Sequence, residues 1–270
     1  LLWTIMQSIS IGDQVRVQVD PSADGIHLSC GRARLPADSR NTAWRAAAVF
    51  IAEAELKAGV KIILQKKIPT AAGLAGGSTD AAAVLAALEN LYPGRISRHR
   101  LFELAARIGA DVPFCLEGGT VLCQGIGEVL TPLPAWEDIP ILLVKPGFGL
   151  STPWIFGQFR LDNPGPRPDQ AAVLKAVRTR DLQALSAATN NVLESVSLAA
   201  RPELARIKTL LAESGAGLTL MSGSGPTIFG LYSTRRDCEA ARDYLTGKLL
   251  KDTMVIMGRT VAHGPFLLED

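Results

Sequence analysis

Apolar and polar residues alternate near the start of the chain, and this pattern predicts β-strands. Between Ile9 and Val19, apolar side chains recur at alternate positions, which is typical of a strand with one buried face. After a turn at Pro21–Gly25, the alternation continues from Ile26 to Cys30. We therefore predict a β-hairpin in this region.

The spacing of apolar residues then changes to that of a helix. From Asn41 to Ala58 they recur at intervals of three and four, and Gly59 is expected to end this helix. Val60–Lys67 has the composition of a strand, and the alanine-rich stretch Ser78–Leu91 predicts a second helix. The predicted order is strand, glycine loop, helix.

The rest of the chain continues as a mixture of helices and strands around a proline-rich hinge at Thr131–Ala135. The predicted helices are Ser97–Ile108, Gln170–Val177, Asp181–Ala187, Pro202–Glu213 and Thr234–Thr246. The predicted strands lie within Gly118–Leu130, Ile139–Val144, Leu218–Met221, Thr227–Tyr232 and Thr253–Thr260, and residues 109–114 are expected to form a loop. These elements indicate an α+β protein with two domains, 1–135 and 136–270.

Composition and charge exclude several classes of function. The 270 residues include 28 Lys and Arg against 26 Asp and Glu, so nothing favours a nucleic acid or an anionic membrane as partner. The apolar runs are far shorter than the ~20 residues that span a bilayer. The 4 cysteines form no CxxC pair, which favours a reducing cytosol. The chain opens without an initiator methionine or a secretory leader, so we expect the true start to lie upstream.

The segment Pro69–Ala83 carries the strongest chemical signal. Gly73, Gly76 and Gly77 lie where the chain turns from strand to helix, so backbone N–H groups can converge on an anion. The helix starting near Ser78 directs its positive end to the same point. We predict a phosphate site, with close helix packing as the alternative. The spacing matches neither a Walker loop nor a Rossmann fingerprint.

Two glycine motifs together resemble those of the GHMP kinases. Pro69–Ala83 resembles their ATP-binding loop, and Leu220–Phe229 is similar to their C-terminal glycine motif, in the expected order. The resemblance implies an N-terminal domain like domain 2 of ribosomal protein S5, a ferredoxin-like C-terminal domain and an active site in the cleft between them. It also implies ATP and Mg²⁺ as cofactors.

Three further stretches narrow the expected substrate. Leu2–Val15, Ile108–Gly119 and Gly125–Leu133 resemble the GHMP kinases that phosphorylate the 2-hydroxyl of 4-diphosphocytidyl-2-C-methyl-D-erythritol in non-mevalonate isoprenoid synthesis. The resemblance implies this small molecule as partner in a bacterial cytoplasm, with the plastid stroma as an alternative. That family places a catalytic lysine and a cytidine-binding aromatic–histidine pair in a segment that would precede Leu1.

Asp111 is the candidate catalytic residue. A carboxylate beside the acceptor hydroxyl can take its proton or align it, and residues 109–113 match the family segment that holds the catalytic aspartate. Spacing alone leaves a helix N-cap as the alternative for Asp111. Ser78, at the mouth of the predicted helix, is a candidate Mg²⁺ ligand because Mg²⁺ prefers hard oxygen ligands.

The resemblance implies further binding residues. Those expected to bind ATP are Gly73, Leu74, Ala75, Gly76, Gly77, Ser78, Thr79, Lys66, Asn41 and Thr42. Phe156, Asp111 and Gly223 are expected to bind substrate, with Phe156 stacking on the cytosine. The plain alternatives are a core position for Phe156, a solvated Lys66 and an ordinary hairpin turn at Gly223. Glu117, Glu128 and Glu194 are interpreted as surface or capping carboxylates.

Two other functions stay open at the level of sequence. One is a GHMP kinase for mevalonate, homoserine or a sugar, which would differ only in the acceptor. The other is a nucleotide-binding regulator that keeps the phosphate loop but lacks catalysis, although the presence of Asp111 argues against it.

Overall fold

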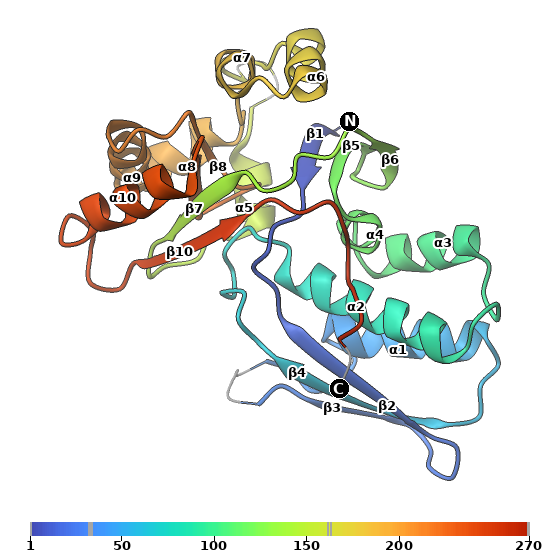
Figure 1. Cartoon of the computed structure of the whole chain (residues 1–270). Helices are drawn as coiled ribbons and strands as arrows, with labels where there is room; N and C mark the ends of the chain where they lie inside the picture. Colours follow the sequence, from blue (N-terminus) through green and yellow to red (C-terminus); the bar gives the residue numbers. More distant parts are fainter. Residues whose placement is uncertain (1, 32–34, 161, 163, 269–270) are drawn as a thin grey trace. The chain divides into compact units, whose positions relative to one another are not determined.

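The computed structural model describes residues 2–31, 35–160, 162 and 164–268, and Figure 1 shows its helices and strands. The strands are β1 (Leu2–Gln7), β2 (Gln14–Asp20), β3 (Ile26–Ser29), β4 (Gly59–Gln65), β5 (Thr120–Gly125), β6 (Val129–Pro132), β7 (Pro140–Lys145), β8 (Leu218–Met221), β9 (Ile228–Leu231) and β10 (Met254–Arg259). The helices are α1 (Thr42–Glu53), α2 (Gly76–Leu91), α3 (Arg98–Ile108), α4 (Val112–Glu117), α5 (Thr152–Gln158), α6 (Gln170–Thr179), α7 (Leu182–Ala188), α8 (Glu194–Ala200), α9 (Pro202–Glu213) and α10 (Arg235–Leu245). The predicted α+β class is confirmed.

The described chain divides into two compact units. Unit 1 contains the residues up to Pro69, then Ala75–Ala135, and the residues from Val261 on. Unit 2 contains Thr70–Leu74 and Trp136–Thr260. A single division after residue 135 does not describe these units. Thr70–Leu74 precedes that position but belongs to unit 2, and the residues from Val261 on follow it but belong to unit 1. The chain passes from unit 2 into unit 1 in the middle of the glycine loop.

Unit 1 contains two small sheets and helices α1–α4. One sheet has the order β1-β5-β6 and the other β2-β4-β3. In the second sheet, Ile62 of β4 pairs with Val17 of the antiparallel β2 and with Leu28 of the parallel β3. The predicted hairpin between β2 and β3 is therefore wrong. Alternation along a strand shows which face is buried, but it does not identify the neighbouring strand.

The core of unit 1 lies between the second sheet and the helices. The stripe of α1 that faces it is fully buried: Ala43, Ala46, Ala47 and Phe50. Helix α1 ends at Glu53, and Glu55 adopts a φ of 52°, so the prediction that Gly59 ends the helix is wrong. Gly59 instead begins β4, where an added Cβ would lie 2.9 Å from the Cβ of Ala23. The glycine permits a close approach of strand and turn.

Two segments of unit 1 depart from the predicted elements. The alternation predicted one strand over 9–19, but only its second half forms a strand, β2. Strand β1 ends before it, and Ser8–Asp13 lies between β1 and β2. The predicted loop over 109–114 contains the start of α4. Pro113 at the second position of α4 suits a first helical turn, where a backbone donor is not needed.

Unit 2 is built on one antiparallel sheet of 4 strands in the order β10-β7-β9-β8. Its central strand β7 is almost fully buried, as its uninterrupted apolar run predicts. Helices α9 and α10 pack their apolar sides on the sheet through residues such as Leu204, Leu211 and Ala241. Helices α5 and α8 were not predicted, whereas α7, which also has 7 residues, was.

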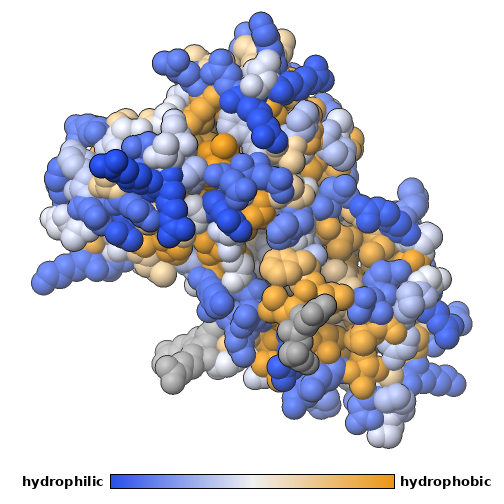
Figure 2. Space-filling view, in the orientation of Figure 1, coloured by the Kyte–Doolittle hydropathy of each residue, from blue (hydrophilic) through white to orange (hydrophobic). Residues whose placement is uncertain are grey.

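The surface and the cysteines match the composition. Figure 2 shows hydrophilic side chains interspersed with hydrophobic areas on the visible face. Among the described residues, no helix has the length and apolar character needed to cross a bilayer. All 4 cysteines, Cys30, Cys115, Cys123 and Cys238, are buried and form no disulfide.

Candidate active site

The N-terminus of α2 in unit 1 is arranged to bind an anion. Ala75 precedes the helix in the left-handed conformation with a φ of 51°. The first intrahelical hydrogen bond runs from the N–H of Thr79 to the carbonyl of Ala75 at 2.9 Å. The N–H groups of Gly76, Gly77 and Ser78 precede that bond, so the helix itself supplies no carbonyl for them. Such a cluster of donors at the positive end of a helix is a fitting site for phosphate.

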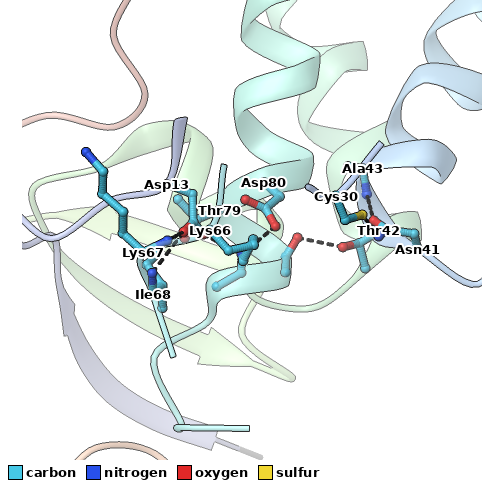
Figure 3. Close-up of polar contacts among 12 residues, drawn as sticks. Asp13, Cys30, Asn41, Thr42, Ala43, Lys66, Lys67, Ile68, Thr79 and Asp80 are labelled. Atoms are coloured by element: carbon cyan, nitrogen blue, oxygen red, sulfur yellow. Dashed lines mark hydrogen bonds and ion pairs between the residues drawn. The ribbon is translucent and has the colours of Figure 1, made fainter. Parts of the chain in front are cut away.

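The start of α1 is joined to the start of α2. The Thr42 hydroxyl donates to the Gly77 carbonyl at 2.6 Å (Figure 3). A Cβ on Gly77 would lie 3.2 Å from the same hydroxyl, which explains the need for a small residue there. Asn41 caps α1 by accepting from the N–H of Ala43 at 2.9 Å, and its amide donates to the Pro36 carbonyl at 2.9 Å. Asn41 thus fixes the start of α1, while Thr42 reaches the loop.

Lys66 lies between two buried carboxylates, as Figure 3 shows. Its ammonium donates to Asp80 Oδ2 at 2.6 Å and forms a very short contact with Asp13 Oδ2. The exposed side-chain fractions of Lys66, Asp13 and Asp80 are 9%, 1% and 3%. The other oxygen of Asp13 accepts from the N–H groups of Lys67 and Ile68 at 2.5 and 2.9 Å. The alternative of a solvated Lys66 is therefore wrong.

Asp13 and Asp80 share the Lys66 ammonium, and Asp80 has fewer hydrogen-bond donors around its carboxylate than Asp13 has. Asp80 Oδ1 is buried without a hydrogen-bond partner among the described residues. Burial raises the pKa of Asp80 to about 7, and the charge of Asp13 adds to this while the Lys66 ammonium opposes it. The pKa of Lys66 is raised because its hydrogen bonds to both carboxylates outweigh the effect of burial. The cluster holds an ammonium beside the N-terminal end of α2, 3.5 Å from the Gly76 carbonyl oxygen.

Asp111 occupies the N-cap position of α4, and its carbonyl accepts from the N–H of Cys115 at 3.0 Å. Its side chain makes no capping hydrogen bond, so the N-cap alternative holds for the position of Asp111 but not for its carboxylate. Burial raises the pKa of Asp111 above its ordinary value. A carboxylate with a raised pKa is a stronger base when it is ionised. The raised pKa is consistent with the predicted role of Asp111 as a proton acceptor.

The segment around Asp111 lies beside α2. A Cβ placed on Gly109 would lie 4.0 Å from Ser78 Oγ. Cys115 of α4 lies 3.6 Å from the Thr79 hydroxyl. Burial raises the pKa of Cys115 to about 12, and the charge of Asp111 contributes. The start of α2 and the segment that contains Asp111 are thus neighbours within unit 1.

Unit 2 holds the first part of the glycine loop. Gly73 has a φ of 72°, and an added Cβ would lie 2.5 Å from the Ser222 carbonyl oxygen. The Ser222 hydroxyl donates to the Gly73 carbonyl at 2.8 Å, and the N–H of Thr227 donates to the Ala72 carbonyl at 3.3 Å. Gly223 lies in the connection between β8 and β9, so this hairpin turn also contacts the loop.

Helix α5 of unit 2 presents Phe156 to solvent. The side chain is 51% exposed, so the alternative of a core position is wrong. Ser151 caps the helix, and the Thr152 hydroxyl lies 2.7 Å from the Ser224 hydroxyl. An exposed aromatic ring on a short, capped helix is available to stack on a planar ligand.

Sequence reasoning did not find Asp13 and Asp80, although a signal for Asp80 exists. Asp80, Val84 and Leu88 follow each other at intervals of four and are all buried. An acidic residue on the apolar stripe of a helix requires a partner of opposite charge. That requirement points to a nearby lysine, but it does not identify Lys66. For Asp13, the local sequence offers no comparable signal.

Comparison with known protein families matches both halves of the chain. The model described as the GHMP kinases N terminal domain matches residues 41–119. The model described as GHMP kinases C terminal matches residues 173–251.

Two curated proteins, both 4-diphosphocytidyl-2-C-methyl-D-erythritol kinases, are similar over most of their length. The protein of a Synechococcus species is 45% identical over 249 residues, which cover 89% of this chain and 80% of that protein. The protein of Clostridium perfringens is 39% identical over 261 residues, which cover 97% of this chain and 90% of that protein.

Solved structures share the fold. A crystal structure of 4-(cytidine 5'-diphospho)-2C-methyl-D-erythritol kinase is 34% identical with a TM-score of 0.76, covering 97% of this chain and 90% of that one. A crystal structure of homoserine kinase from Cytophaga hutchinsonii is 18% identical with a TM-score of 0.79, covering 96% of this chain and 89% of that one. The homoserine kinase shows a common fold, whereas the 34% identical structure also shows a clear relationship in sequence.

Proposed function

The chain belongs to the GHMP kinases, within them to the 4-diphosphocytidyl-2-C-methyl-D-erythritol kinase family, and on that basis we propose the reaction that it catalyses. It is a phosphotransferase that uses ATP. It transfers the γ-phosphoryl group to the 2-hydroxyl of 4-diphosphocytidyl-2-C-methyl-D-erythritol, a step in making isoprenoid precursors by the non-mevalonate route. The observation that supports the proposal is that the segment before Asp111 lies beside α2 in one unit, where a Cβ on Gly109 would lie 4.0 Å from Ser78 Oγ.

The N–H groups at the start of α2 are the proposed phosphate ligands. Phosphoryl transfer passes through a loose transition state with negative charge spread over the γ-phosphoryl oxygens. Fixed donors from Gly76, Gly77 and Ser78 stabilise this charge without having to reorient. The geometry of Thr42 and Gly77 supports the role, because it holds the first turn of α2 in place.

Asp111 is the proposed base for the acceptor hydroxyl. As the bond forms between the 2-oxygen and the γ-phosphorus, the bond to the β-phosphate oxygen breaks and ADP leaves. The hydroxyl proton passes to the Asp111 carboxylate. The raised pKa of Asp111 supports this role, since it makes the carboxylate a better proton acceptor.

The proposed contacts to the acceptor lie in unit 2. The exposed ring of Phe156 is the candidate for stacking on the cytosine, and Gly223 is the candidate for a backbone contact. Stacking of an aromatic side chain on a base contributes about 1–3 kcal/mol. The printed names of the relatives supply the identity of this acceptor.

The Ser78 hydroxyl is the proposed protein ligand for Mg²⁺. Across residues 2–31, 35–160, 162 and 164–268, no group of three or more His, Cys, Asp or Glu residues is arranged to hold a metal ion. A hydroxyl beside phosphate oxygens fits the preference of Mg²⁺ for hard oxygen ligands. When bound, the ion would neutralise part of the phosphate charge.

The matched relatives are bacterial proteins. A bacterial cytoplasm is accordingly the proposed setting, and the proposed partner is the small-molecule acceptor.

A coupled assay for ADP release tests the proposed function. Turnover is expected with 4-diphosphocytidyl-2-C-methyl-D-erythritol and not with mevalonate, homoserine or galactose. Asp111→Asn is expected to lower kcat by about 10²–10⁴-fold with little change in nucleotide affinity. Asp24→Asn, which makes the same change at an exposed position of unit 1, serves as the control. ATP binding without turnover on any acceptor would favour a regulator instead.

A further inference from the structure

Asn191 of unit 2 holds the turn between β8 and β9. Its side-chain amide donates to the carbonyls of Met221 and Gly223 at 2.9 and 2.7 Å. Its side-chain oxygen accepts from the N–H of Leu193 at 3.0 Å. Both amide hydrogens and the oxygen are therefore engaged, which fixes the orientation of the side chain.

Glu194 holds the same turn through a backbone donor. Its Oε1 accepts from the N–H of Met221 at 2.8 Å, and its Oε2 lies 2.5 Å from the Lys208 ammonium. The Glu194 side chain is only 12% exposed, so the interpretation as a surface or capping carboxylate is wrong. Asn191 and Glu194 together bind both the N–H and the carbonyl of Met221. We refer to these two side chains as the turn clamp.

The residue that follows Met221 contacts the glycine loop. The Ser222 hydroxyl donates to the Gly73 carbonyl. The close approach leaves no space for adjustment, because a Cβ on Gly73 would lie 2.7 Å from the Gly225 carbonyl oxygen as well as 2.5 Å from that of Ser222. A shift of the turn would therefore displace the backbone at Gly73. All of these contacts lie within unit 2.

We propose that Asn191 and Glu194 are positioning residues for nucleotide binding, which act through Ser222 on the loop backbone at Gly73. The inference rests on the proposed use of that loop to bind the phosphates of ATP. Preorganised backbone donors bind an anion without an ordering cost at the moment of binding. Loss of the turn clamp would add that cost, and nucleotide affinity would fall.

The substitution Asn191→Asp separates this role from packing. Aspartate has nearly the same shape and keeps the acceptor for Leu193, but it faces the carbonyl oxygens of Met221 and Gly223 with an acceptor instead of donors. Asn190→Asp provides a matched control, because the adjacent side chain is exposed and gains the same charge. Glu194→Gln keeps an oxygen that can accept from Met221, whereas Glu194→Ala does not.

The primary measurement is the Kd of a non-hydrolysable ATP analogue, obtained by calorimetry. Asn191→Asp and Glu194→Ala are expected to weaken binding about tenfold, as the loss of one or two hydrogen bonds implies. Asn190→Asp and Glu194→Gln should stay within about threefold of the unchanged protein. In steady-state kinetics, the KM for ATP should rise while the KM for the acceptor stays the same.

Two further measurements locate the effect at the loop. Amide hydrogen exchange in the peptide that contains Thr70–Leu74 should become faster in Asn191→Asp. In the double variant of Asn191→Asp and Ser222→Ala, the loss of nucleotide binding free energy should be smaller than the sum of the two single losses. Both substitutions interrupt the same set of contacts to Gly73.

Several outcomes would overturn the proposal. An unchanged Kd in Asn191→Asp would do so, as would an equal loss in Asn190→Asp or full additivity with Ser222→Ala. If Asn191→Asp does not fold, Asn191→Ala replaces it under the same criteria. Because the analogue binds without an acceptor, a failure of the proposed reaction would appear separately, as absent turnover in the unchanged protein.

Discussion

Replacement of Asp80 by asparagine should change how the stability of unit 1 depends on pH. The folded protein raises the pKa of Asp80 to about 7 from an ordinary value of 3.8. Between these values the folded chain binds a proton that the unfolded chain has released, so this group makes the folded state less stable as the pH rises. Asparagine cannot ionise, and this contribution is then lost.

The magnitude follows from the difference between the two pKa values. A difference of about three units corresponds to roughly 4 kcal/mol at full ionisation. Between pH 5 and pH 8, the change amounts to about 3 kcal/mol. The side chain is 3% exposed, so solvent screening reduces this figure little. The free energy of unfolding of Asp80→Asn should therefore gain about 3 kcal/mol relative to the unchanged protein over this range.

Urea denaturation at several pH values, followed by circular dichroism, measures this difference. Taking the difference between the two proteins at each pH cancels contributions from groups that do not interact with Asp80, and what remains reports on the cluster of Asp80, Lys66 and Asp13. Any hydrogen bonds that the asparagine amide loses or gains alter the free energy of unfolding by the same amount at every pH. Only the variation of the difference in unfolding free energy with pH therefore reports on the ionisation of Asp80. A difference that stays constant from pH 5 to pH 8 would show that Asp80 ionises normally and would refute the reasoning.

Three more expectations follow from the same contacts. Lys66→Met leaves two buried carboxylates without their cation and should lower the free energy of unfolding by about 3–5 kcal/mol in calorimetry; a loss below about 1 kcal/mol would contradict the described cluster. Gly73→Ala forces a Cβ against the Ser222 carbonyl and should weaken ATP-analogue binding at least about tenfold. Gly247 also has a positive φ, of 79°, but open space surrounds it, so Gly247→Ala should leave binding unchanged. The pH–rate profile should show an acid limb above the usual aspartate range, because burial raises the pKa of Asp111; a limb at an ordinary aspartate pKa would argue against Asp111 as the base.

Local signals predicted the elements of the fold well. The buried run of β7 and the first residues and apolar stripes of α1 and α3 lie where the sequence pattern indicates. The partners of β2 and β3 could not be predicted, because the strand between them, β4, comes later in the chain. Helices of about two turns give only a weak periodic signal, so α5 and α8 were missed although α7, of the same length, was found.

The candidate site was predictable in part. Glycine spacing indicated the anion site at α2, and the family resemblance pointed to Asp111. The contacts that fix Lys66 and Asn191 join residues that are distant in the sequence, and no local pattern specifies them. Glu194 was misinterpreted for the same reason, since its partner Met221 lies 27 positions away. The roles of the α2 donors, Ser78, Asp111, Phe156 and Gly223 all stay predictions.

The placement of the buried cysteines offers a way to follow the two units separately. Cys30, Cys115 and Cys123 lie in unit 1, and Cys238 lies in unit 2. Burial raises the pKa of each thiol, so the native protein holds few reactive thiolates. An alkylating reagent should modify a thiol only after the unit around it opens. Mass spectrometry of the labelled peptides would then report, without an added probe, which half of the molecule opens first.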